Sequence, residues 1–137
     1  MKKFLVVAAL ATSSLAYAAG EAIMVYKDEN CGCCEGWVGH LRESGYKVKA
    51  VNSNDMEAVK KRLGVPGKLS SCHTAVVDGT GQVIEGHVPA AAVQKLIAQP
   101  EVKGVAASGM PLNSPGMGKL DGTLVTVDFL GKAFSKD

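Results

Sequence analysis

The sequence is poor in aromatic residues, which make up 5% of its 137 positions, and it contains a single tryptophan. Glycine, in contrast, occurs 16 times. This combination predicts a small α/β protein with an extensive loop-rich portion. Long apolar runs are also missing, because the apolar segment 4–11 is far shorter than the roughly 20 residues that a membrane-spanning helix needs.

The first residues have the three parts of a secretory signal peptide. Lys2 and Lys3 form a basic start, residues 4–11 form an apolar run, and residues 16–18 form a small-x-small cleavage site. We expect cleavage after position 18, so residues 1–18 would be removed on export. No cysteine follows the cleavage site, so no lipid anchor is predicted. A signal of this type indicates export to a bacterial periplasm or secretion from the cell.

The exported chain, residues 19–137, has no excess of charge of either sign. Removing residues 1–18 removes two lysines and no acids, which leaves 13 basic and 13 acidic residues. Such a balance does not favour binding to nucleic acid or to an anionic membrane. A chain of this length is expected to form one domain around one core.

The alternation of strand-like and helix-like segments predicts an α/β fold with a central mixed β-sheet flanked by helices. The expected order is strand, helix, strand, helix, strand, strand, helix, over residues 22–27, 34–44, 46–52, 54–64, 74–77, 82–86 and 87–99. Residues 100–118 contain glycine, proline and methionine without periodicity, so we expect a long C-terminal loop there. Residues 122–134 alternate like an edge strand that closes the chain.

Three of the four cysteines, Cys31, Cys33 and Cys34, lie together between the first strand and the first helix. Four cysteines in an oxidising compartment would ordinarily form two disulfides. Here two disulfides would require an awkward pairing within the cluster, since a bond between the neighbours Cys33 and Cys34 is strained. The start of a helix stabilises thiolate, which both attacks disulfides and binds metals. Position alone therefore leaves redox and metal-binding roles open.

One hypothesis is a thiol–disulfide oxidoreductase. Cys31 and Cys34 have the C-x-x-C spacing of a nucleophile and its resolving thiol, placed between a strand and a helix. Cys33 would compete with the resolving thiol, and Cys72 would have no task in simple exchange. These two cysteines count against the oxidoreductase hypothesis.

The second hypothesis is a site for a soft metal. Three clustered thiolates suit sulfur bridging between metal ions, and Cys72, in the loop before the third strand, would supply a fourth sulfur. Thiolate with thioether selects Cu(I), whereas thiolate with imidazole also suits Zn(II). In a periplasmic setting copper is the predicted ion and zinc the second candidate. An iron–sulfur cluster matches the cysteine count, but the spacing matches neither common ferredoxin pattern.

Three histidines and two methionines are further candidate ligands. His73 adjoins Cys72, so it is either a ligand or the neighbour of one. His40 lies on the first helix, where a half-buried histidine bonded to a carbonyl is the simpler interpretation. His87 precedes the third helix and suits a loop or capping role. Met110 and Met117 lie in the long loop, where they would either bind copper or pack the loop onto the core.

Four segments in order resemble the small periplasmic copper-resistance proteins of the CopG type. They are CGCCEGWVGHLRESGY, LGVPGKLSSCHTAVVDG, EGHVPAAAVQKL and GMPLNSPGMG, and the resemblance as a whole extends from about Ile23 to Met117. The resemblance implies a thioredoxin-like fold and a cysteine-bridged site with several copper ions. It also implies a role in interconverting Cu(I) and Cu(II) as part of copper tolerance.

Carried over by position, the resemblance implies that the copper ligands include Cys31, Cys33, Cys34 and Cys72. It gives more weight to His40, His73, His87, Met110 and Met117 than spacing alone does. In thioredoxins a proline precedes the third strand and faces the active disulfide, whereas Cys72 and His73 stand there in this sequence. We therefore expect a copper-binding protein with His73 as the first nitrogen donor, with copper ions and other periplasmic copper-handling proteins as partners.

Overall fold

The computed structural model describes residues 20–137, so the secretory signal expected over residues 1–18 lies outside the described residues. The helices are α1 (Gly32–Glu43), α2 (Met56–Arg62) and α3 (Ala90–Ile97), with a short 3-10 turn η1 (Gly67–Leu69). The strands are β1 (Ala22–Lys27), β2 (Lys47–Asn52), β3 (Thr74–Val77), β4 (Val83–Gly86), β5 (Gly104–Ala107), β6 (Val125–Asp128) and β7 (Ala133–Lys136). In residues 20–137, no helix combines the length and apolar character needed to cross a membrane.

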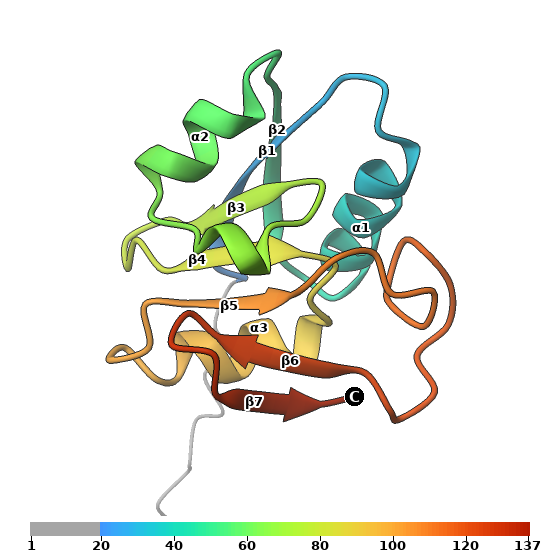
Figure 1. The fold of residues 1–137 in the computed structure, drawn as a ribbon. Helices are drawn as coiled ribbons and strands as arrows, with labels where there is room; N and C mark the ends of the chain where they lie inside the picture. The colour runs from blue at the N-terminus through green and yellow to red at the C-terminus, as the bar shows by residue number, and fades with distance from the viewer. Residues whose placement is uncertain (1–19) are drawn as a thin grey trace, which may run out of the picture.

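One sheet runs through the structure in the order β2–β1–β3–β4–β5–β6–β7 (Figure 1). β1 pairs with β2 in parallel, and β4 pairs with β5 in parallel. The other neighbours are antiparallel. The predicted α/β class with a central mixed sheet is therefore confirmed.

The main core lies between the sheet and the two helices α1 and α3. Its members are apolar residues of these helices and of alternate strand positions: Ile23, Val25, Trp37, Val38, Leu41, Ala75, Val77, Ile84, Val88, Ala92, Val93, Leu96, Val105, Ala107 and Phe134. Helix α2 covers the opposite face, because its Lys60 contacts Thr74 and Glu85. The side chains of those two residues alternate with Ala75 and Ile84 of the core.

Local sequence explains where the two helices around the cysteines begin and end. Helix α1 ends just before Gly45, which adopts a φ of 93° that other residues rarely reach. The side chain of Asp55 caps α2 by accepting a hydrogen bond from the backbone of Ala58 at 3.0 Å. The observed ends of α1 and α2 agree with the predicted helix ends, at residues 44 and 64, to within two or three residues.

The C-terminal part contains more β-structure than the sequence pattern predicts. The expected loop 100–118 contains β5, whose four residues are all buried, so that no polar alternation marks the strand. The expected single strand 122–134 is a hairpin of β6 and β7, with a turn at Gly131 (φ 85°). A register shift between Thr126 and Val127 interrupts the alternation there. These three strands extend the sheet beyond β4.

Candidate metal centre

The first three cysteines lie where β1 leads into α1. Cys31 is the N-cap residue of α1, and Cys33 and Cys34 are in its first turn. The turn is tied to the sheet by Lys27, the buried last residue of β1, whose ammonium lies 2.7 Å from the carboxylate of Glu35. The cysteines therefore sit at the positive end of the helix, where thiolate is stabilised.

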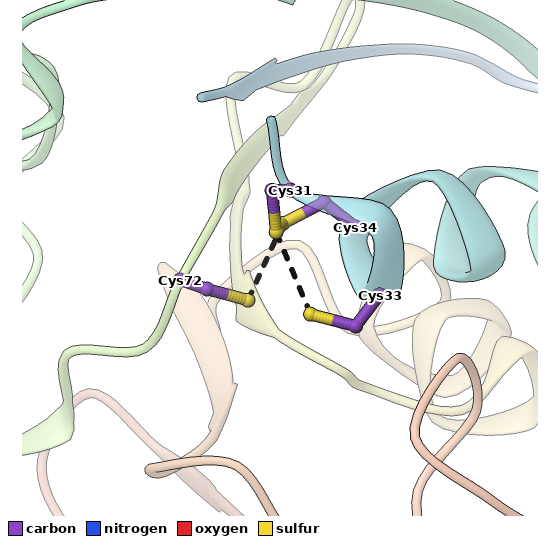
Figure 2. A group of neighbouring side chains, drawn as sticks. All are labelled: Cys31, Cys33, Cys34 and Cys72. Carbon is purple, nitrogen blue, oxygen red and sulfur yellow. Dashed lines mark hydrogen bonds between the residues drawn. A yellow bond between two sulfur atoms is a disulfide. The ribbon is translucent and has the colours of Figure 1, made fainter. Parts of the chain in front are cut away.

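Cys31 and Cys34 form a disulfide, and Cys33 and Cys72 are free thiols. The sulfur of Cys33 lies 3.5 Å from that of Cys31, and the sulfur of Cys72 lies 3.4 Å from that of Cys34. Figure 2 shows Cys72 reaching from the loop before β3 toward the three cysteines of α1. All four sulfurs lie within 4.8 Å of one another, so the structure brings the four predicted cysteines together.

Cys72 also belongs to a second group, with His73 and His87. Its sulfur lies 3.1 Å from Nε2 of His87 and 3.3 Å from Nδ1 of His73. Both histidines are fully buried. Cys72 is therefore shared by an all-sulfur group and a sulfur–imidazole group.

The orientation of His87 is set by the long loop between β5 and β6. Its Nδ1 lies 2.7 Å from the carbonyl oxygen of Pro115. Because a carbonyl can only accept, Nδ1 carries the proton and donates it, which leaves the lone pair of Nε2 facing Cys72. Metal-binding histidines characteristically donate a hydrogen bond from their second ring nitrogen to a carbonyl or carboxylate in this way.

His73 is held between aromatic neighbours. Its ring centroid lies 4.4 Å from that of Trp37 and 4.9 Å from that of His87. Trp37 is itself anchored, because its Nε1–H donates to the carbonyl of Val88 at 2.8 Å. Within residues 20–137, Nε2 of His73 has no hydrogen-bond partner. Trp37 thus packs against His73 and is itself held in place by Val88.

Burial sets the protonation of the second group. It raises the pKa of the Cys72 thiol to about 11, and the neighbouring Cys33 adds to this increase. It lowers the pKa of His73 to about 3, with smaller contributions from His87 and Lys60. Burial also lowers the pKa of His87. Neutral imidazoles are the form that binds metals, whereas Cys72 must lose its proton when a cation binds.

His40, Met110 and Met117 are the remaining candidates. His40 is in neither group, and its Nε2 accepts a hydrogen bond from the backbone of Ala90 at 3.0 Å. Met110 is 47% exposed, and Met117 is partly buried in the same loop. That loop contacts the site through backbone atoms near Gly116, where an added Cβ would lie 2.6 Å from the carbonyl oxygen of Cys33.

Glu85 is a buried residue next to the site that the sequence patterns did not single out. Its carboxylate accepts hydrogen bonds from the backbone of Ser71, at 2.7 Å, and from the hydroxyl of Thr74, at 2.6 Å. Lys60 of α2 forms an ion pair with it at 2.5 Å. A single acid within an otherwise apolar strand is the one local signal that could have identified it.

The donor set fits a copper ion. Thiolate and imidazole together are ligands for Cu(I), and an imidazole also accommodates Cu(II). Cys31 and Cys34 can bind only after their disulfide is reduced, because the thiolate is the binding form. The fit therefore applies to the reduced protein, in which Cys72 would be shared between a group of four sulfurs and a group with two imidazole nitrogens.

Known proteins resemble this chain in sequence and in fold. A family described as "Protein of unknown function, DUF411" matches residues 69–117. Two solved structures, entitled "Copper resistance protein copG", Form 1 and Form 2, are each 44% identical to this chain. Their TM-scores are 0.74 and 0.75, and the similarity covers 86% of this chain and 98% of each of theirs. No curated protein was found to match. The chain therefore belongs to the CopG family of copper resistance proteins.

Proposed function

We propose that this protein binds copper in the periplasm as part of copper resistance. The observation that carries the proposal is the place of Cys72, whose sulfur lies 3.4 Å from that of Cys34 and 3.1 Å from Nε2 of His87. A soft thiolate shared in this way joins the cysteines of α1 to a buried imidazole. The export signal expected over residues 1–18 and the two CopG structures support the location and the role.

The site offers enough donor atoms for more than one copper ion. The cysteine group offers four sulfurs, and the second group offers Cys72, His73 and His87. A thiolate bridges two ions when each has other ligands on its far side, and Cys72 lies in that position. We therefore assign the cluster as a multinuclear, cysteine-bridged site.

The Cys31–Cys34 pair gives the site a means of exchanging electrons with copper. Reduction of the disulfide to two thiolates takes up two electrons, and oxidation of two Cu(I) ions to Cu(II) releases two. The reverse reaction forms the disulfide and returns two Cu(I) ions. This balance supports cycling between the two oxidation states, with other periplasmic copper-handling proteins delivering and removing the ions.

A thiol–disulfide oxidoreductase is the second candidate function, favoured by the oxidised C-x-x-C pair at the start of α1. The order β2–β1–β3–β4, with β3 antiparallel to β1, also supports assigning the first four strands to a thioredoxin-like sheet. Cys33, 3.5 Å from the sulfur of Cys31, would however capture the mixed disulfide that such exchange requires. We therefore rank copper binding first.

The first test compares metal content in the Cys72→Ser variant and the wild type. Each protein is reduced without oxygen, offered copper and zinc together, desalted and analysed by elemental mass spectrometry. We expect at least about two copper ions per wild-type chain with little zinc, since thiolate clusters select Cu(I). The variant should lose most of its copper because the shared sulfur is missing.

The Ser70→Ala variant serves as the control, because Ser70 is exposed in the same loop. Its copper content should equal that of the wild type. Equal copper in the Cys72→Ser variant and the wild type would refute the shared-sulfur site. A wild type that retains no metal, but whose Cys31–Cys34 pair reacts readily with a dithiol, would instead establish the oxidoreductase.

A further inference from the structure

Cys72 lies in a loop, whereas the other three cysteines are held by a helix terminus. The loop joins η1 to β3, so no regular hydrogen-bonding ladder fixes the backbone at Ser71 and Cys72. A metal ligand on an unsupported loop would contribute less to the affinity for the metal, because each binding event would have to order the loop. The position of the Cys72 sulfur therefore requires an anchor elsewhere in the fold.

Glu85 of β4 provides hydrogen bonds on both sides of Cys72. One carboxylate oxygen accepts from the backbone N–H of Ser71 at 2.7 Å, directly before the cysteine. The other accepts from the hydroxyl of Thr74 at 2.6 Å, two residues after it. The four-residue segment 71–74, which carries Cys72, is thus fastened to one side chain of the neighbouring strand.

Gly86, the next residue along β4, completes the contact. Its N–H donates to the carbonyl of His73 at 3.0 Å. Its φ is 74°, and an added Cβ would lie 2.6 Å from the side chain of Ser71. The end of β4 therefore approaches the Cys72 loop closely, and this approach is what brings the carboxylate of Glu85 within reach of Ser71.

The charge on Glu85 is compensated locally. The ammonium of Lys60 lies 2.5 Å from the carboxylate and also donates to the hydroxyl of Thr74 at 2.9 Å. Burying a carboxylate is costly unless it is paired and fully hydrogen-bonded, and an apolar pair of similar size often gives equal or greater stability. A carboxylate is nevertheless the group that can accept from a backbone N–H, a hydroxyl and an ammonium at once.

We propose that Glu85 is a positioning residue for the copper site, which holds Cys72 in place through its hydrogen bonds to Ser71 and Thr74. The inference rests on the proposed copper-binding function for its biological meaning. The positioning itself is a property of the metal-free protein. It can therefore be measured whether or not copper binds.

The test uses the oxidised protein, in which Cys33 and Cys72 are the two free thiols of the described chain. Alkylation by iodoacetamide is followed over time, and peptide mass spectrometry gives a separate rate for each thiol. Cys33 is the internal reference, because it lies on α1 and not on the Glu85-anchored loop. Cu(I) affinity is then measured on the reduced proteins by competition with a chromogenic chelator.

Gln82→Ala is the matched control for Glu85→Ala. Gln82 is also buried, and its amide donates to the carbonyls of Leu96, Gln99 and Val102 at 2.8–3.0 Å. Its loss removes buried hydrogen bonds at the opposite end of β4 from the cysteines. Glu85→Gln is the rescue variant, since its carbonyl oxygen can still accept from Ser71.

In Glu85→Ala the alkylation rate of Cys72 relative to Cys33 should rise about tenfold, because the loop opens more easily without these bonds. The affinity of the reduced variant for Cu(I) should fall about 10- to 100-fold, as for other residues that orient metal ligands. Glu85→Gln should show smaller changes in the same direction, and Gln82→Ala should show neither.

An unchanged ratio of alkylation rates in Glu85→Ala, or an equal rise in Gln82→Ala, would overturn the positioning role. If Glu85→Ala does not fold, Thr74→Val decides by the same ratio, because it removes the Thr74 hydrogen bond to Glu85, and an unchanged value overturns the proposal. A wild type without affinity for Cu(I) would refute the proposed function. The alkylation rates would still show whether Glu85 positions Cys72.

Discussion

At the scale of single residues, the three histidines differ in what their ring nitrogens face. His73 and His87 face Cys72, whereas Nε2 of His40 accepts from the backbone of Ala90, in the first turn of α3. That helix has Pro89 as its N-cap residue, without a side-chain cap of its own. His40 therefore supplies a cap from another helix, which requires the neutral imidazole that its lowered pKa provides.

Replacing His40 with alanine should lower stability without changing copper content. The loss of a partly buried hydrogen bond at a helix start is expected to reduce the free energy of unfolding by about 1 kcal/mol. Urea unfolding of the metal-free protein measures this change. Lys61→Ala, an exposed position on α2, is the control and should leave both quantities unchanged. Loss of copper in His40→Ala would place His40 among the ligands instead.

At the scale of elements, the site depends on how the loop between β5 and β6 packs against α1. Gly116 has a φ of 87°, and an added Cβ would lie 2.6 Å from the carbonyl oxygen of Cys33 and 2.7 Å from the backbone nitrogen of Trp37. The adjacent Pro115 provides the carbonyl that orients His87. In Figure 1 this orange loop lies beside α1, although the two are far apart in the sequence.

Gly116→Ala should separate the loop from α1 and weaken copper binding. Gly131→Ala is a matched control, because Gly131 has a similar φ of 85° but no atom within 4 Å of an added Cβ. Both variants should lose about 1 kcal/mol of stability from backbone strain. Only Gly116→Ala should also weaken Cu(I) binding, since His87 would lose its orientation. Equal affinities in a chelator competition would show that the loop does not support the site.

At the scale of the whole molecule, the buried groups predict a stability maximum near neutral pH for the oxidised, metal-free protein. The pKa of His73 is lowered from 6.5 to about 3 on folding, so the unfolded chain binds more protons below pH 6.5 and stability falls as the pH drops. The pKa of Cys72 is raised from 9.0 to about 11, so stability also falls as the pH rises above 9.

Urea unfolding at a series of pH values measures both limbs of this profile. His73→Phe, which keeps a ring beside Trp37, should flatten the acidic limb. Cys72→Ser should flatten the alkaline limb, because a hydroxyl does not titrate in this range. Equal stability of the wild type at about pH 5 and about pH 7.5 would contradict the assignment of a buried, neutral histidine.

Sequence patterns were sufficient to predict the α/β class, the mixed sheet and the order of helices and strands through α3. Strands β1 and β3 occupy the expected residues 22–27 and 74–77. These features depend on local periodicity, capping residues and glycine stops, which act over a few positions. The cysteine cluster was also evident, because three thiols within four positions are a property of the sequence alone.

The tertiary structure decided which distant residues meet. Strand β5 could not be recognised because all four of its residues are buried. The meeting of Cys34 with Cys72, 38 positions apart, and of His87 with Pro115, 28 positions apart, depends on sheet register and on the path of the last loop. The sequence by itself thus determined the donors and the framework. Packing decided which histidines meet the cysteines: His73 and His87 lie at Cys72, whereas His40 lies at α3. Such contacts between distant segments form only when the chain closes around one core.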